Sequence, residues 1–328
     1  MVKIRSSISI VYLGPEYLLS KLGKKGTVSD ICFYNYKKED LTVSFITPVK
    51  YPDRVQSLLY AMTLGDTVIL NIPAMDGALG EEIIAIDLLN KTDGFITTLS
   101  QLDPDIFNSE EGKKYQYIDA ANIDKISRDH LIAGYRKLNK IDELYKWMDT
   151  YSSKPSDINQ PYMAIDHSFM VKGVGTVILS ILRDGNIKVH DTMMLYPSKK
   201  IVEIKSIQVH DINREEAYSS ERVGIAFKGL NIDEVERGNI IAMPDSLSIA
   251  DKVTGTFHLN PFYKKTVNAG MHATLYINMQ SVPCVVTNLS DSSIDLELGK
   301  KITYKEGWTG LLLTLDSKLP RIAGKVKM

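Results

Sequence analysis

The 328-residue chain is poor in the residues that build disulfide frameworks and metal sites. Its two cysteines, Cys32 and Cys284, lie far apart, so they provide neither a disulfide framework nor a cysteine-based zinc site. None of the six histidines has another histidine three to five residues away, which is the spacing of zinc-binding pairs. The motifs H-E-x-x-H and G-x-S-x-G are absent. We therefore expect no metal site and assign no catalytic residues.

An excess of charge and long apolar runs are also missing. Lys and Arg number 39 and Asp and Glu number 40, which leaves a formal net charge of -1. This balance excludes a uniformly basic nucleic-acid binder and a disordered acidic chain. No apolar run reaches the roughly 18 residues of a membrane span, and the N-terminus lacks the pattern of a signal peptide. We expect a cytoplasmic protein that has no membrane partner and is a monomer.

The first 150 residues alternate short β-rich runs with helical patterns. The β-rich runs are residues 8–13, 31–36, 41–46, 67–72 and 94–99, and the helical patterns are residues 54–64, 81–89 and about 126–148. Strands that alternate with helices are typical of a parallel, doubly wound α/β sheet. The following stretch, residues 152–161, has two prolines and no apolar periodicity, which predicts a linker.

The second half of the chain contains short β-rich runs separated by turns, without a helical pattern. One series covers residues 175–182, 201–209, 222–227 and 239–242, and another covers residues 253–259, 272–277, 282–289, 293–298 and 310–315. This pattern predicts β-barrels or β-sandwiches. A break near residues 244–251 divides the two series. Residues 251–328 carry ten basic and six acidic side chains, so this segment could meet phosphates, although a solvated surface explains the charge equally well.

Two short motifs are similar to nucleotide-binding signatures. Gly173-Val174-Gly175 could begin a dinucleotide fingerprint, but a strand pattern follows it instead of a helix. The sequence Asn90-Lys91-Thr92-Asp93 matches the guanine-reading N-K-x-D motif of GTPases. That motif must follow a strand at the carboxyl edge of the sheet, whereas this one ends a helical pattern and precedes a strand. We therefore interpret residues 90–93 as a helix terminus.

Longer stretches carry a family resemblance. Residues 164–197 and 205–242 resemble domain II of the EF-Tu superfamily of translational GTPases, and Ser-Ile-Gln-Val-His-Asp at 206–211 is most similar to SelB. Residues 22–40 and the pair Tyr51-Pro52 resemble a small archaeal group of SelB-like EF-Tu paralogues, the EF-Pyl-like group. The resemblance implies a GTPase-like α/β domain at 1–155, a domain II-like β-barrel at 160–248 and a domain III-like β-barrel at 250–328.

The first domain departs from the GTPase pattern at its chemical motifs. A phosphate loop, G-x-x-x-x-G-K-[ST], needs glycines and a lysine, but Leu19 and Ser20 stand where Gly and Lys belong. The D-x-P-G-H motif, whose Asp contacts magnesium, is replaced by Phe-Ile-Thr-Pro-Val-Lys at residues 45–50. Gly14 and Asp103 alone can remain from a nucleotide site. We expect a vestigial GTPase domain without a cofactor, and GTP with magnesium only if this domain still binds them.

For the barrels, the resemblance implies contacts with tRNA. Carried over residue by residue, the pocket for the 3′-terminal adenine falls on five residues: Gly175, Thr176, Val177, Gln208 and Arg222. Gln208 takes the place of a Glu in EF-Tu, and Arg222 is the expected nearby cation. Phosphates of the acceptor or T-stem would be contacted by four lysines of the last barrel: Lys264, Lys265, Lys300 and Lys301. The glycines could instead serve only the turns of the barrel.

The sequence thus favours a SelB-like elongation factor paralogue that binds tRNA, charged or uncharged, and that could meet the ribosome. One alternative is a translation-associated module that binds proteins and no RNA. Another is a GTP-binding elongation factor with altered motifs, which would then be an active GTPase. Which tRNA or amino acid is handled does not follow from the residues.

Overall fold

The computed structural model describes residues 6–115, 117–119, 121–151, 160–316 and 318–328. The chain forms two compact units, residues 1–153 with 318–320, and residues 154–317 with 321–328. Most of the predicted linker, residues 152–159, lies outside the described residues. Because both β-rich segments fall in the second unit, the three predicted domain boundaries stay a prediction. Among the described residues, no helix is both long and apolar enough to span a membrane.

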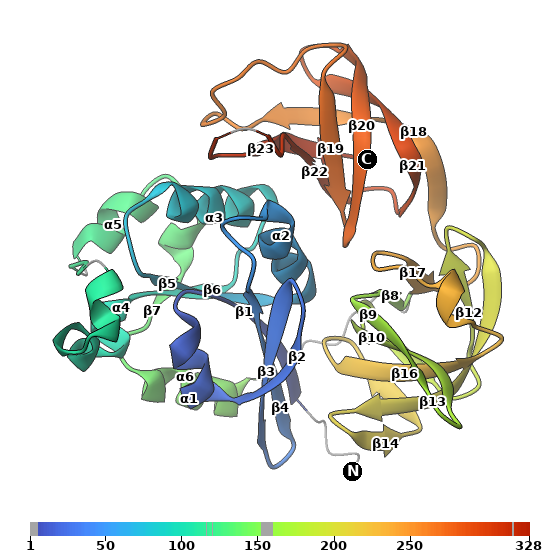
Figure 1. Cartoon of the computed structure of the whole chain (residues 1–328), viewed down its shortest axis with the longest axis horizontal. Coiled ribbons are helices and arrows are strands. Elements are labelled where there is room, and N and C mark those ends of the chain that lie inside the picture. The colour runs from blue at the N-terminus through green and yellow to red at the C-terminus, as the bar shows by residue number, and fades with distance from the viewer. Residues whose placement is uncertain (1–5, 116, 120, 152–159, 317) are drawn as a thin grey trace. The chain divides into compact units, whose positions relative to one another are not determined.

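A seven-stranded sheet forms the first unit, in the order β2-β3-β4-β1-β5-β6-β7 (Figure 1). Its strands are β1 (Ser6–Leu13), β2 (Lys24–Val28), β3 (Ile31–Lys38), β4 (Leu41–Pro48), β5 (Thr67–Ile72), β6 (Gly94–Thr98) and β7 (Arg136–Lys137). The prediction of a parallel sheet is confirmed for β4, β1, β5, β6 and β7. It is wrong for β3, which runs against both of its neighbours. Only two residues separate β3 from each neighbour, and a parallel connection needs a long crossover.

Helices cover both faces of this sheet (Figure 1). On one face, α1 (Leu19–Leu22) and α6 (Ile141–Thr150) share a hydrophobic core with β1. On the other face lie α2 (Val55–Leu64) and α3 (Gly77–Leu88), as the sequence predicted. The single helix predicted at 126–148 is wrong, because that segment is divided among α5 (Ala121–Ser127), a 3₁₀ turn at Leu131–Gly134, β7 and α6. The backbone around Leu138 bonds to β6 instead of continuing a helix, since its amide donates to the Ile96 carbonyl.

The first β-rich segment folds into a sheet in the order β8-β17-β12-β13-β16-β10-β9. Its strands are β8 (Tyr162–Ala164), β9 (His167–Val171), β10 (Gly175–Ile181), β12 (Thr192–Tyr196), β13 (Lys200–Val209), β16 (Arg222–Lys228) and β17 (Ile240–Ala242). The two ends of this sheet, β8 and β9, are separated by only two residues. Ile165 donates a backbone hydrogen bond to Asn239, and the next residue, Asp166, donates one to Leu179. One continuous run therefore joins both ends, so the sheet curls around its own apolar core.

The second β-rich segment is a closed barrel in the order β18-β21-β20-β19-β22-β23. Its strands are β18 (Ser248–Leu259), β19 (His272–Ile277), β20 (Gln280–Leu289), β21 (Ser293–Tyr304), β22 (Thr309–Leu313) and β23 (Ile322–Lys327). A separate cluster of buried apolar side chains fills its interior. The predicted fold class, an α/β domain followed by all-β barrels, is confirmed.

Candidate functional site

Three neighbouring strands of the first barrel bring the predicted acceptor-end residues to one outer surface. Gly224 of β16 lies opposite Leu179 of β10 on one side and opposite Gln208 of β13 on the other. Val223 and Ile225 point into the core, so Gly224 faces outward, because successive residues of a strand alternate. Gly224 has no side chain and is half-buried, and a Cβ built there would lie 3.3 Å from Cδ2 of Leu179, so the Leu179 side chain lies close to this position. The strands of Leu179 and Gln208 lie about 10 Å apart, on either side of Gly224.

The amide of Gln208 is held in place by a neighbour. Its Nε2 donates a hydrogen bond of 2.9 Å to Oδ1 of Asn213, which lies in β14 (Ile212–Arg214), the partner of β13. The turn between them is His210-Asp211, with φ of 48° and 63°, values typical of a two-residue type I′ hairpin. Gln208 is exposed, and with its nitrogen engaged, its amide oxygen is the group that can accept a hydrogen bond from a ligand.

The glycine-rich turn before β10 presents backbone more than side chains. Gly175 has φ of 109°, which favours glycine. Thr176 is buried as a whole residue, and its hydroxyl has no hydrogen-bond partner among the described residues, so Thr176 presents almost no surface to a ligand. Val177 is half-buried on the outer face. Nζ of Lys205 donates 2.7 Å to the carbonyl of Val174 and fixes the turn. Lys205 was missed from the sequence, because alternation along a strand places it on the face opposite to Gln208, and the irregularity between Ile204 and Ser206 is decided by pairing with β16.

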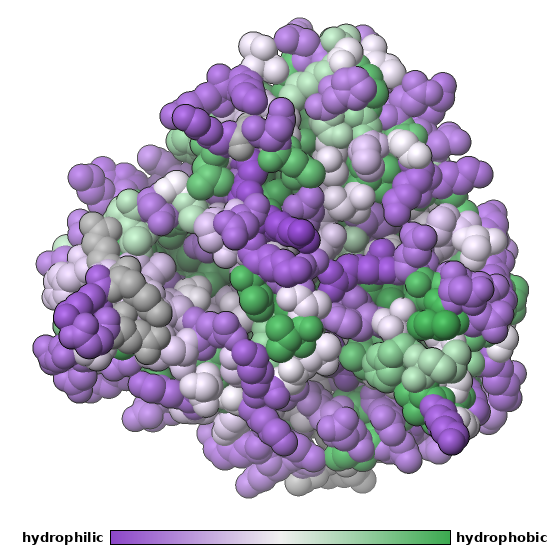
Figure 2. All heavy atoms as spheres, viewed as in Figure 1, coloured by the Kyte–Doolittle hydropathy of each residue, from purple (hydrophilic) through white to green (hydrophobic). Residues whose placement is uncertain are grey.

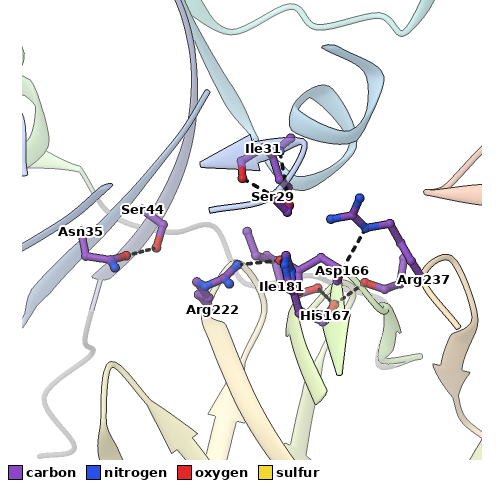
Figure 3. A network of polar contacts seen from close by, with 11 residues as sticks. Ser29, Ile31, Asn35, Ser44, Asp166, His167, Ile181, Arg222 and Arg237 are labelled. Carbon is purple, nitrogen blue, oxygen red and sulfur yellow. Dashed lines mark hydrogen bonds and ion pairs between the residues drawn. The ribbon is translucent and has the colours of Figure 1, made fainter. Parts of the chain in front are cut away.

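Arg222 is committed to a buried carboxylate (Figure 3). Its Nη1 donates 3.0 Å to Oδ2 of Asp166, and its side chain is 10% exposed. Nε of Arg237 donates 2.9 Å to the carbonyl of Asp166. Burial alone would raise the pKa of Asp166, but the neighbouring Arg222 lowers it below its ordinary value. Arg222 therefore supports the barrel at the junction of β8 and β9, and its contact with RNA stays a prediction.

The four predicted lysines lie at two separate places on the last barrel. All four are exposed. Lys300 and Lys301 belong to β21, close to the position where Ala250 of β18 pairs with Ile302. Lys264 and Lys265 follow the far end of β18, which ends at Leu259. Ala250 and Leu259 are nine residues apart, or about 30 Å along the strand, so the two lysine pairs lie near opposite ends of β18. Lys300 also lies 3.6 Å from Glu236 of the first barrel.

In the first unit, β1 does not lead into a phosphate loop. A 3₁₀ turn (Glu16–Leu18) and the four-residue helix α1 follow it. Three leucines of this segment are buried: Leu18, Leu19 and Leu22. The segment therefore packs onto the sheet through apolar side chains. Gly14 is required for packing, since a Cβ there would lie 2.8 Å from Cβ of Asn71.

The other predicted remnant, Asp103, has partners within the same unit. Its Oδ2 accepts hydrogen bonds of 3.1 Å each from the Tyr17 hydroxyl and from Nζ of Lys21. On the opposite flank, Oε1 of Glu16 accepts 2.9 Å from Nζ of Lys25 and 2.7 Å from the Tyr34 hydroxyl. These contacts bring Gly14 and Asp103 to the same edge of the sheet.

The interpretation of residues 90–93 as a helix terminus is confirmed. They follow α3 and precede β6, and Asp93 accepts hydrogen bonds of 2.7 Å from Thr67 and from Arg136. Nζ of Lys91 donates 2.7 Å to the carbonyl of Gly65. Thr67 begins β5, so these contacts lie at the amino edge of the sheet. In the described part of the chain, no three His, Cys, Asp or Glu residues are grouped so that they could hold a metal ion.

The similarities of this chain to known proteins cover nearly its whole length. Residues 175–242 match the family model for Elongation factor Tu domain 2. The chain is 33% identical to an uncharacterized protein of Methanocaldococcus jannaschii, with 94% of each chain covered. It is 27% identical to the selenocysteine-specific elongation factor of the same organism, over 80% of this chain and 58% of that factor. Translation elongation factor SelB from Methanococcus maripaludis, solved with the GTP analogue GppNHp, has a TM-score of 0.80 at 20% identity, covering 98% of this chain and 79% of SelB.

Proposed function

This chain belongs to the EF-Tu/SelB superfamily of translation elongation factors, and we propose that it binds the acceptor end of a tRNA without using a bound nucleotide. The row Leu179–Gly224–Gln208 carries the proposal, because it places an apolar side chain, a position without a side chain and an exposed, hydrogen-bonded amide side by side on one outer surface. A base laid over Gly224 would contact Leu179 at one edge and accept or donate hydrogen bonds at Gln208.

The turn before β10 and the lysines extend this surface. The terminal ribose would approach the backbone at Gly175 and Val177, with the buried Thr176 between them, since no atom of the described residues beyond its chain neighbours lies within 4 Å of a Cβ built at Gly175. Because the two lysine pairs lie near opposite ends of β18, one tRNA would use them at different points of its helix. Contacts with phosphates fix the position of the RNA and do not read its sequence.

Two features of the first unit, the short helix α1 and the contacts of Asp103, support the proposal that no nucleotide cycle takes place. A phosphate cradle needs free backbone N–H groups at the start of a long helix, whereas α1 has four residues and its leucines are buried. Asp103, the remaining candidate for reading a base, already accepts two hydrogen bonds from Tyr17 and Lys21. Without a nucleotide, release of tRNA would not be driven by hydrolysis, so the protein would sequester, protect or hand over its tRNA.

A gel-shift assay with charged and uncharged tRNA at several salt concentrations tests RNA binding. We expect a shift at low salt that weakens as salt rises. Absence of a shift at low salt would contradict the proposal. Titration with a fluorescent GTP analogue in magnesium tests the proposal that no nucleotide is used, and micromolar affinity would contradict it.

One observation favours a protein partner as a second candidate function. The β9–β10 hairpin exposes Phe169, Met170 and Val174, with exposed fractions of 42%, 58% and 36%. On the face seen in Figure 2, apolar side chains reach the surface of the second unit among hydrophilic ones. Apolar side chains gathered at a strand edge are typical of protein contacts. If Phe169→Ser and Met170→Ser leave tRNA binding unchanged but abolish binding of a purified translation component, this function is supported.

A further inference from the structure

Two loops that are far apart in the sequence are tied together at the carboxyl ends of β1 and β6. Tyr17 and Lys21 belong to the segment after β1, and Asp103 follows α4 (Leu99–Leu102), directly after β6. Both donors reach the same oxygen, Oδ2 of Asp103, at 3.1 Å. Nζ of Lys21 also lies 5.7 Å from the centre of the Tyr17 ring. The Asp103 side chain is 17% exposed, so these contacts are partly shielded from water.

The same segment is held from its other sides. Beneath it, Leu18, Leu19 and Leu22 are buried in the core. From α6, the Tyr145 hydroxyl donates 3.1 Å to the carbonyl of Lys21. Burial and the hydrogen bond to Asp103 raise the pKa of Tyr17 above its usual range, so its hydroxyl remains a donor at neutral pH. The segment from residue 16 to 22 is therefore fixed by apolar packing, by α6 and by Asp103 at once.

We propose that residues 16–22 form an internal plug that fills the nucleotide end of the sheet and holds the loops after β1 and β6 in one arrangement without a ligand. Ligands of α/β sheets bind at the carboxyl ends of parallel strands, and here side chains of the chain itself take that place. This proposal rests on the proposed nucleotide-independent function. It adds a reason why no nucleotide is bound, because Asp103 already accepts hydrogen bonds from Tyr17 and Lys21 of the same unit. It follows that a substitution that loosens one of the two loops should also loosen the other.

Hydrogen exchange of the full-length protein, followed by mass spectrometry, tests this coupling. Lys21→Met keeps the length of the side chain and removes its charge. We expect exchange to become at least about fivefold faster both at residues 16–25 and at residues 99–109, as loss of about 1 kcal/mol of local stability would cause. The matched control is Lys38→Met, which breaks the exposed 2.6 Å ion pair of Lys38 with Asp149 in the same unit. This control should change the exchange rate of neither segment by more than about twofold.

A milder variant and a double-mutant cycle keep the result interpretable. Tyr17→Phe removes one hydroxyl and leaves the packing intact, so it serves if Lys21→Met does not fold. In the cycle of Lys21→Met with Asp103→Asn, the effects on exchange should be less than additive, because the two side chains share one contact. Faster exchange confined to residues 16–25, or fully additive effects, would overturn the plug. GTP binding by the wild-type protein would overturn the proposed function, whereas these exchange results in a protein that binds no GTP would overturn the plug alone, so the two failures are distinguishable.

Discussion

Nη1 of Arg222 lies 3.0 Å from Oδ2 of Asp166, and the Asp166 side chain has no exposed surface. The two residues are 56 positions apart in the sequence, and they meet where the run from β8 to β9 changes its partner from β17 to β10. The second carboxylate oxygen of Asp166 has no partner among the described residues. This pair lies at the junction of β8 and β9, so we expect the stability of the first barrel to depend on both residues.

Arg222→Met should destabilise the second unit by about 3–5 kcal/mol, because it leaves a buried carboxylate without its cation. Urea unfolding checks this in a Trp147→Phe background, in which Trp308 of the second unit is the remaining tryptophan. Lys228→Met breaks the exposed pair of Lys228 with Glu203 and should cost less than about 1 kcal/mol. An equal loss of unfolding free energy in the two variants would show that the buried Arg222–Asp166 pair contributes no more than an exposed pair.

Gln208→Ala should weaken tRNA binding about two- to tenfold, because one hydrogen bond contributes a net of about 0.5–1.5 kcal/mol. Thr192→Ala is the control, since Thr192 is an exposed residue of β12 in the same sheet. Fluorescence anisotropy with labelled tRNA gives both dissociation constants. If the two variants bind alike, the acceptor end does not lie on the row Leu179–Gly224–Gln208.

Replacing Lys264 and Lys265 by Met, or Lys300 and Lys301 by Met, should each reduce the salt dependence of tRNA binding. Each lysine that contacts a phosphate contributes about 1 to the slope of log K against log salt concentration. The control is Lys252→Met, because Lys252 lies 3.6 Å from Glu297 on the same barrel. An unchanged slope in a double variant would remove that lysine pair from the RNA interface, independently of the other pair.

Glu16→Gln should change the pH dependence of the stability of the first unit. Hydrogen bonds from Lys25 and then Tyr34 lower the pKa of Glu16 below its ordinary value. A lowered pKa in the folded state stabilises the protein above the unfolded-state pKa of about 4.3, and this contribution is lost as the pH falls through the folded-state pKa. The variant should be less stable than wild type at neutral pH, and the difference should vanish in strong acid. Urea unfolding at neutral pH and in strong acid measures the difference in a Trp308→Phe background, in which Trp147 of the first unit is the remaining tryptophan. A difference that stays constant between the two pH values would contradict the assignment.

Much of the secondary structure was predictable, because it follows from patterns over a few residues. Strands β1, β4 and β5 and helix α2 were placed within a few residues by their apolar periodicity. The resemblance at residues 164–197 and 205–242 indicated the first barrel, and the match over residues 175–242 agrees with it. The broken helix at 126–148 was missed, because pairing of residues 136–138 with β6 overrides the local helical pattern.

By itself, the sequence determined the order of the elements, the two kinds of sheet and the loss of the phosphate-loop motif, since each is written in residues that are neighbours along the chain. Only the tertiary structure decided that Arg222 pairs with Asp166, that Asp103 is occupied by Tyr17 and Lys21, and that the four lysines form two separate pairs. The physical reason is that hydrogen bonds and ion pairs act over a few ångströms. Which groups come that close depends on how strands and loops far apart in the sequence are brought together.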